Sequence, residues 1–186
     1  MADPCCADVG RLIASLGFDL LTGGGGGVME AVSRAFFETQ PRRGLVIGVL
    51  PGEVTPLGAV EARRNDPVRY DPKPGYPNSW VEIAIYTHLP DSGPDGTLVT
   101  SRNHINVLSA DAIVALPGEA GTESAIWLAT RYGVPAIAYG NHREGAPLHG
   151  LALARSIDGV RSFLLLHLVG ESLDAAGQPA EERRDL

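Results

Sequence analysis

A glycine-bearing turn between residues 115 and 125 is the segment best suited to binding an anion. Its sequence, ALPGEAGTESA, follows an apolar run and leads into a helical pattern. Gly118 and Gly121 keep the turn open, and Thr122 offers a hydroxyl beside the unpaired N–H groups that begin a helix. These donors suit a phosphate or a ribose. A helix cap that binds no ligand is the alternative.

A second turn of the same kind is the run Gly23, Gly24, Gly25, Gly26 and Gly27. Glycine lets a ligand approach main-chain N–H groups closely, and the helix predicted to follow presents the positive end of its dipole. The spacing is neither the dinucleotide-binding fingerprint nor the phosphate-loop lysine motif. The run therefore indicates either a ligand contact or a close-packed turn.

One arginine has a position from which it can serve the same cleft. Arg102 lies in the stretch Ser101-Arg102-Asn103-His104, fifteen residues before Pro117. A guanidinium at the start of a helix can pair with a phosphate through two parallel hydrogen bonds. Without such a ligand, Arg102 would be an ordinary solvated arginine.

Metal binding has no support in the sequence. The five histidines show no paired ligand spacing and no cysteine pair accompanies them, so we predict no metal site. The segments that must position the turns alternate between strand and helix patterns. Strands are predicted at 18–22, 44–50, 81–86, 111–116 and 134–139, and helices at 4–16, 28–37, 101–109, 123–132 and 157–168.

This alternation predicts an α/β fold of the Rossmann type, a doubly wound and mostly parallel sheet flanked by helices. Ligands bind such sheets beyond the carboxyl ends of the strands, where both glycine-bearing turns are expected. The connection 51–80 is rich in Pro, Gly, Arg and Asp and has only weak periodicity. Connections of this length are usually functional or mobile.

The length of 186 residues predicts one domain, residues 1–186, with a polar tail from about 175. The net charge of −7 argues against a nucleic-acid partner, and no apolar run is long enough to cross a membrane. The adjacent Cys5 and Cys6 indicate a reducing compartment without a structural disulfide, so we expect a cytoplasmic protein.

Several motifs together resemble one superfamily. A glycine run followed by Val-Met-Glu-Ala, the arginine before Pro-Gly, and Pro-Gly-x-x-Gly-Thr are similar to the LONELY GUY and "lysine decarboxylase-like" nucleotide-binding proteins. The stretches GYPN at 75–78, VEIAI at 81–85, THLP at 87–90 and SRNHIN at 101–106 resemble its molybdenum cofactor carrier branch. The likeness covers about residues 8–140. It implies a Rossmann-like fold, a homo-oligomer (dimer or tetramer) and a phosphate-bearing ligand at the strand ends.

The sequence departs from that pattern at three places. The superfamily opens with a strand before the first helix, whereas this sequence starts almost inside that helix, so we expect the first strand to be encoded upstream or missing. The phosphoribohydrolase branch carries a catalytic glutamate where this chain has Ala125, and a lysine where it has Asn103. Arg102 matches the catalytic arginine of that branch. Glu119, in the loop before the helix, is the carboxylate that would have to replace the missing glutamate.

These features favour a binding or carrier protein over an enzyme. The expected cargo is the molybdenum cofactor or a nucleotide monophosphate. Its phosphate is expected on the N–H groups around Gly121 and Thr122 and on Arg102, while the glycine run admits the rest of the ligand. The full predicted set of binding residues is Gly23, Gly24, Gly25, Gly26, Gly27, Arg102, Asn103, Pro117, Gly118, Gly121 and Thr122. The alternative is a nucleoside 5′-monophosphate phosphoribohydrolase that uses Arg102 and Glu119.

Overall fold

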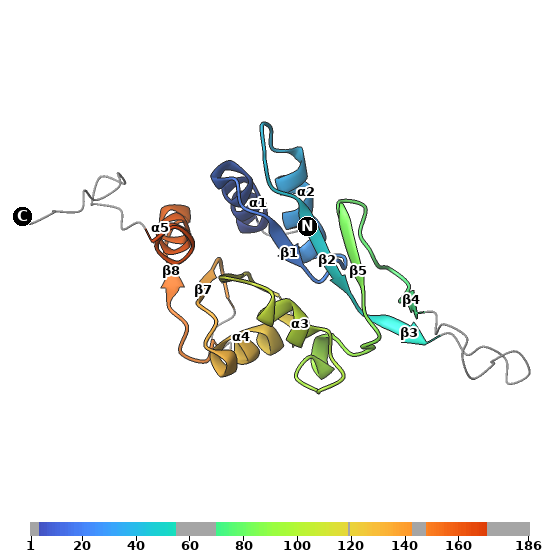
Figure 1. Ribbon diagram of the computed structural model, residues 1–186. Helices are drawn as coiled ribbons and strands as arrows, with labels where there is room; N and C mark the ends of the chain where they lie inside the picture. Colours follow the sequence, from blue (N-terminus) through green and yellow to red (C-terminus); the bar gives the residue numbers. More distant parts are fainter. Residues whose placement is uncertain (1–3, 55–69, 119, 143–147, 171–186) are drawn as a thin grey trace, which may run out of the picture.

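A computed structural model describes residues 4–54, 70–118, 120–142 and 148–170 (Figure 1). The strands form two three-stranded parallel sheets and one short antiparallel pair. Glu119, residues 55–69 of the connection 51–80, and the polar tail expected from about 175 lie outside the described residues. The α/β class with mostly parallel strands flanked by helices is confirmed.

The first parallel sheet has the strand order β1-β2-β5. Its strands are β1 (Leu20–Thr22), β2 (Val46–Leu50) and β5 (Ile83–Tyr86), and its helices are α1 (Pro4–Leu16) and α2 (Val28–Glu38). Four of the five residues of β2 are buried, as expected for a strand covered on both faces. Gly17, which follows α1, has a φ of +79°, a value that favours glycine and ends the helix.

The second parallel sheet has the order β6-β7-β8. Its strands are β6 (Ile113–Ala115), β7 (Ala136–Tyr139) and β8 (Leu153–Ala154), and the helices of this half are α3 (Asn103–Leu108), α4 (Ala120–Tyr132) and α5 (Ile157–Leu168). The Ser156 side chain accepts a hydrogen bond from the Gly159 N–H and caps α5.

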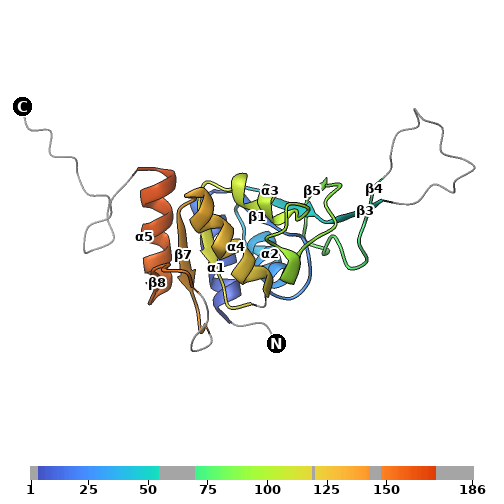
Figure 2. The same ribbon diagram turned by 90° about the horizontal axis from the view of Figure 1, so that it is seen from below.

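Helix α1 packs against both sheets, as Figures 1 and 2 show. Cys6 and Val9 share one core with Leu20 of β1 and Leu116, and Leu12 on the same helix lies in a second core with Ile137 of β7. β1 and β6 thus contribute to a common interior, although no hydrogen-bonded pairing between them is found in the described ranges. Helix α1 therefore joins the first parallel sheet to the second by contributing to both cores.

Three predictions about elements were incomplete or wrong. Helix α4 begins at Ala120 and not at 123, so Gly121 and Thr122 belong to its first turn. The connection 51–80 contains an antiparallel pair, β3 (Gly52–Val54) with β4 (Tyr70–Pro72), and β8 was not predicted. Each of these strands has two or three residues, which is too short for a hydrophobic period to be recognised.

Candidate functional site

Arg102 is almost fully buried where the chain enters α3. The residue is 5% exposed, and its Nη1 donates to the Oδ1 of Asn103 over 2.7 Å. Its Nε–H finds no hydrogen-bond partner in the described part of the chain. The alternative of a solvated surface arginine is therefore wrong.

The Arg102 guanidinium lies directly against Gly23. A Cβ placed on Gly23 would stand 2.2 Å from Nη2, 2.4 Å from Nη1 and 2.5 Å from Cζ. Both terminal nitrogens are nearer than Cζ, so the Nη1–Nη2 edge of the guanidinium is directed at the space that a side chain on residue 23 would occupy. Side-chain atoms do not approach this closely, so only glycine leaves room for Arg102 here. The fold thus brings the glycine run and the arginine, two separate sequence features, into contact.

The electrostatic setting of Arg102 is that of a cation without a counter-ion. Burial lowers the pKa of the Arg102 guanidinium below its ordinary value, and the neighbouring Tyr76 side chain opposes that shift. An arginine keeps its charge even so. No carboxylate pairs with it among residues 4–54, 70–118, 120–142 and 148–170. A buried charge in this condition is costly, and a bound anion would compensate it.

Asn78 fixes the conformation of the glycine run. Its backbone N–H donates to the Gly24 carbonyl over 2.7 Å, and its side-chain Nδ2 donates to the Gly25 carbonyl over 2.9 Å. In a planar trans peptide the C=O and the next N–H point in opposite directions. The N–H groups of Gly25 and Gly26 are therefore directed away from Asn78.

Those two N–H groups are left without an acceptor in the described part of the chain. The Gly24 N–H differs, because it donates to the Oγ1 of Thr22 over 3.1 Å. Helix α2 then begins, and its first internal bond runs from the Ala31 N–H to the Gly27 carbonyl. The loop and the first turn of α2 consequently present unpaired donors together, which is the arrangement that binds anions at helix N-termini.

Tyr76 is a residue of this site that the sequence reasoning missed. A Cβ on Gly25 would stand 2.9 Å from Cε1 and 3.2 Å from Cζ of Tyr76, so the ring lies against the glycine run. The same side chain lies close enough to Arg102 to influence the pKa of its guanidinium. The residue was noted only as part of a family-like stretch, because no spacing rule shows that this loop folds back onto the first glycines.

The first turn of α4, where the sequence predicts the phosphate, is linked to α3 but makes its own local contacts. The hydroxyl of Thr122 is turned back over Gly118, where a Cβ would stand 2.2 Å from its Oγ1. The link to α3 passes through Gly96, where a Cβ would stand 2.4 Å from the Asn103 Nδ2 and 2.5 Å from the Ser124 Cβ. The neighbours found for the Arg102 guanidinium in the described ranges are Gly23, Tyr76 and Asn103, and Thr122 is not among them.

Ala125, at the position of the missing glutamate, is a packing residue. It lies against the buried cluster of Val107, Leu128 and Ala129, where α3 meets α4. This side of α4 is an apolar contact between helices.

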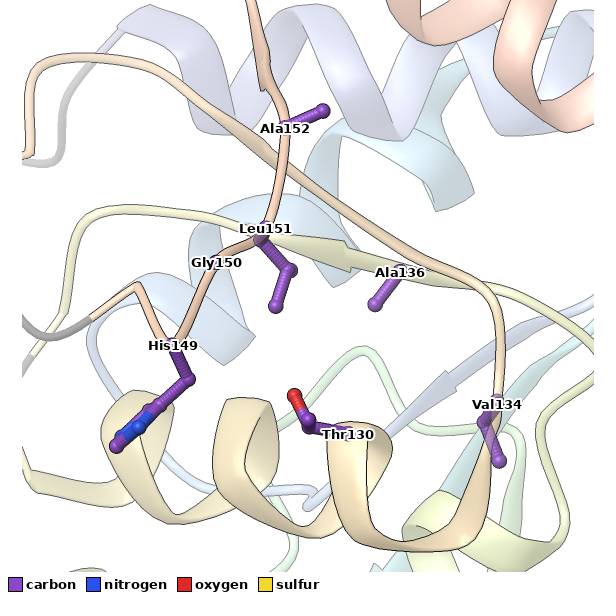
Figure 3. A pocket seen from close by; sticks show the side chains of 7 residues that line it. All are labelled: Thr130, Val134, Ala136, His149, Gly150, Leu151 and Ala152. Atoms are coloured by element: carbon purple, nitrogen blue, oxygen red, sulfur yellow. The ribbon is translucent and has the colours of Figure 1, made fainter.

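The hollow drawn in Figure 3 lies elsewhere, beside the second half of α4. It has a volume of about 250 Å³, and Thr130, Val134, Ala136 and residues 149–152 line it. None of the predicted binding residues is among them. The Thr130 hydroxyl and the His149 ring are its polar side chains, and it contains no arginine or lysine to hold a phosphate.

The histidines that the structure describes serve local contacts. His104 bonds the Tyr132 hydroxyl over 2.6 Å and the Leu98 carbonyl over 2.9 Å, and His142 lies 3.3 Å from the Ala115 carbonyl. The described residues contain no group of three or more His, Cys, Asp and Glu side chains that could hold a metal ion. None of the helices within those same residues is long and apolar enough to cross a bilayer.

Parallel strands, flanking helices and a glycine run that follows a strand define this chain as a Rossmann-like α/β protein with its candidate site at the strand ends. The model of the SLOG cluster4 family matches residues 2–155. The chain belongs to this family.

Individual relatives agree with that assignment. The chain is similar to the molybdenum cofactor binding protein of Rippkaea orientalis, with 28% identity, a TM-score of 0.62, and coverage of 86% of this chain and 83% of the other. It also resembles in fold the molybdenum cofactor carrier protein of Chlamydomonas reinhardtii, with 24% identity, a TM-score of 0.60, and coverage of 88% and 86%.

A curated relative from Archaeoglobus fulgidus, named an uncharacterized protein, is 32% identical over 125 residues. The match covers 67% of this chain and 62% of that relative, so this chain spans less than two thirds of the relative's length. The suspected branch of the superfamily is confirmed by the family match and the likeness to the Rippkaea orientalis protein.

Proposed function

We propose that the protein binds and carries a phosphate-bearing small molecule, with the molybdenum cofactor as cargo and a nucleotide monophosphate as the other candidate ligand. One observation carries the proposal. Arg102 is a buried cation against Gly23 that has no carboxylate partner in the described ranges. The likeness to two proteins described as molybdenum cofactor binding or carrier proteins supports the choice of cargo.

The phosphoryl group is assigned to the side of the glycine run. The contact of Arg102 with Gly23, and the unpaired N–H groups of Gly25 and Gly26, favour that side over the first turn of α4. Pro117, Gly118, Gly121 and Thr122 then contact another part of the ligand, and Asn103 holds the guanidinium in place. This assignment reverses the orientation expected from the sequence.

Titration calorimetry under anaerobic conditions tests the proposal, with the molybdenum cofactor and AMP as separate ligands. Heat of binding from at least one of them, at a stoichiometry of one per chain, is the expected result. Adenosine lacks the phosphate and should bind far more weakly than AMP. No heat from either phosphate-bearing ligand contradicts the proposal.

Nucleotide hydrolysis at the N-glycosidic bond is the second candidate function, and the match of Arg102 to the catalytic arginine of that branch favours it. Such a reaction needs a carboxylate to stabilise an oxocarbenium-like state or to activate water. Glu119 would have to supply it, since Ala125 packs between α3 and α4. Release of free adenine from AMP by the wild type, abolished in Glu119→Gln, would establish this function in place of a carrier.

We also propose that the protein is a cytoplasmic homo-oligomer, with no nucleic-acid or membrane partner. The net charge of −7 opposes binding to phosphate backbones. Apolar side chains around η1 (Gly93–Asp95) and α3 support self-association, because Leu98, Val99 and Leu108 are 49%, 89% and 60% exposed.

A further inference from the structure

Around Gly25, the hydrogen-bond acceptors of the glycine run are paired and its donors are not. Both carbonyls on the Asn78 side of the glycine run, those of Gly24 and Gly25, already accept bonds from Asn78. The N–H groups of Gly25 and Gly26 have no acceptor in the described ranges. Donors are thus left over in the glycine run, while its two acceptors beside Asn78 are in use.

Tyr76 adds one more donor to the same place. The Tyr76 side chain neighbours Arg102, whose guanidinium can only donate hydrogen bonds and so cannot accept one from the phenol. The phenolic O–H then remains as a donor, and no acceptor for it is found among the described residues. The ring lies against Gly25, so this hydroxyl and the Gly25 N–H belong to one small region.

The loop that carries Tyr76 is held in place on both sides of the ring. The Tyr76 N–H donates to the Lys73 carbonyl over 3.1 Å, and Asn78, two residues further on, is bonded to Gly24 and Gly25. Tyr76 itself is partly exposed, so its ring forms a wall of the site that a ligand can reach. A phenol placed in this way is pre-organised for binding.

We propose that Tyr76 is a ligand-binding residue whose hydroxyl donates to a terminal phosphoryl oxygen, and that the ligand class is a fully ionised phosphomonoester. The inference rests on the proposed function. A phosphomonoester dianion has three terminal oxygens that only accept, which matches Tyr76, Arg102 and the N–H groups of Gly25 and Gly26. The monoprotonated form presents a P–O–H among donors and fits less well, and a phosphodiester has only two such oxygens.

Tyr76→Phe tests the assignment, because it removes the hydroxyl and keeps the ring against Gly25. We expect it to weaken AMP binding about 10-fold, the usual effect of losing one hydrogen bond to a charged group. Binding of adenosine should change little. Tyr132→Phe is the matched control, since it also removes a phenolic hydroxyl, that of the His104 contact, outside the site. Circular dichroism verifies that both variants are folded.

The pH dependence of AMP affinity distinguishes a binding role of Tyr76 from a purely structural one, because a structural role would leave that dependence unchanged. Affinity of the wild type for AMP should rise as the phosphate loses its second proton near pH 6. In Tyr76→Phe that rise should be smaller, because one of the donors that favours the dianion is gone. Equal affinity and equal pH profiles in the two proteins overturn the role of Tyr76 and leave the proposed function standing. A wild type that binds no phosphate-bearing ligand overturns the proposed function, and this inference with it.

Discussion

The Arg102 guanidinium can occupy its position only because residue 23 is a glycine and has no side chain. Burying a guanidinium without a carboxylate is unfavourable, and its hydrogen-bond partner Asn103 and its neighbour Tyr76 are both neutral. The arrangement therefore costs stability in the free protein, and it is useful if an anion completes it. Substitutions at this contact should therefore change ligand affinity and folding stability by different amounts.

Gly23→Ala should abolish tight binding of AMP or the molybdenum cofactor. The added Cβ would fall 2.2 to 2.5 Å from three guanidinium atoms and would push Arg102 out of position. We expect a loss of stability of about 1–3 kcal/mol, as for other overpacked interiors. Calorimetric titration and denaturant unfolding measure the two effects.

Gly159→Ala is the control for that substitution, because a Cβ there would meet Ala154 at 3.5 Å and the Ser156 Oγ at 3.9 Å, both ordinary contact distances. It should bind ligand as the wild type does and be equally or more stable. Retained affinity in Gly23→Ala would show that the position of Arg102 does not matter for binding.

Arg102→Met should lose binding while the protein stays folded. The loss of a charged, multiply bonded partner of a phosphate is expected to weaken binding by about 2–5 kcal/mol. Stability should stay within about 1 kcal/mol of wild type, since an uncompensated buried charge is replaced by an apolar chain of similar length. Arg11→Met, at an exposed arginine paired with Asp8, is the control. Strong destabilisation with unchanged affinity would mean that Arg102 is only structural.

At the scale of elements, Glu82 stabilises the first sheet by joining β2 to the segment before β5. Its carboxylate accepts from Arg42 over 2.7 Å and from the Val46 N–H over 3.0 Å, and so joins the start of β2 to the segment before β5. Burial alone would raise the pKa of Glu82. The hydrogen bonds from Arg42 and Val46 and the charge of Arg42 outweigh it, so the pKa lies below its usual value.

Glu82→Gln should therefore destabilise the protein by about 1 kcal/mol at neutral pH. A lowered carboxyl pKa stabilises the fold above the unfolded-state pKa, and this stability disappears as the pH falls through the folded-state value. The difference between variant and wild type should thus be constant from about pH 7 to 5 and shrink below about pH 4.5. Urea unfolding at several pH values measures it, and a difference that grows on acidification would contradict the assignment.

How far the elements follow from the sequence depends on their boundary signals. Helices α1 and α5 were predicted with their observed ends. Pro4 and Gly17 mark the two ends of α1 in the sequence, and the structure shows Ser156 capping the start of α5. The start of α4 was placed three residues late, since Pro117-Gly118 and Gly121 read as a loop. Within the site, Arg102 and the glycine run were identified separately. Their contact and the wall formed by Tyr76 depend on long-range folding that no local period encodes.

At the scale of the whole molecule, the expected self-association can be tested at the η1–α3 surface. Val99 is 89% exposed, with Leu98 and Leu108 as exposed apolar residues nearby in the sequence. Val99→Asp should shift the mass measured by light scattering toward the monomer and leave the circular dichroism unchanged. Val169→Asp, at a 49% exposed valine after α5, is the control. A wild type that is monomeric at all concentrations would refute the expectation.

The position of the bound ligand tests the central claim most directly. A crystal structure of the protein with AMP is predicted to show the phosphoryl group within hydrogen-bonding distance of Arg102 and of the Gly25 and Gly26 N–H groups. AMP bound instead in the hollow of Thr130 and His149 (Figure 3) would contradict it. So would an Arg102 that keeps its contacts with Gly23 and Tyr76 while the phosphate lies out of its reach.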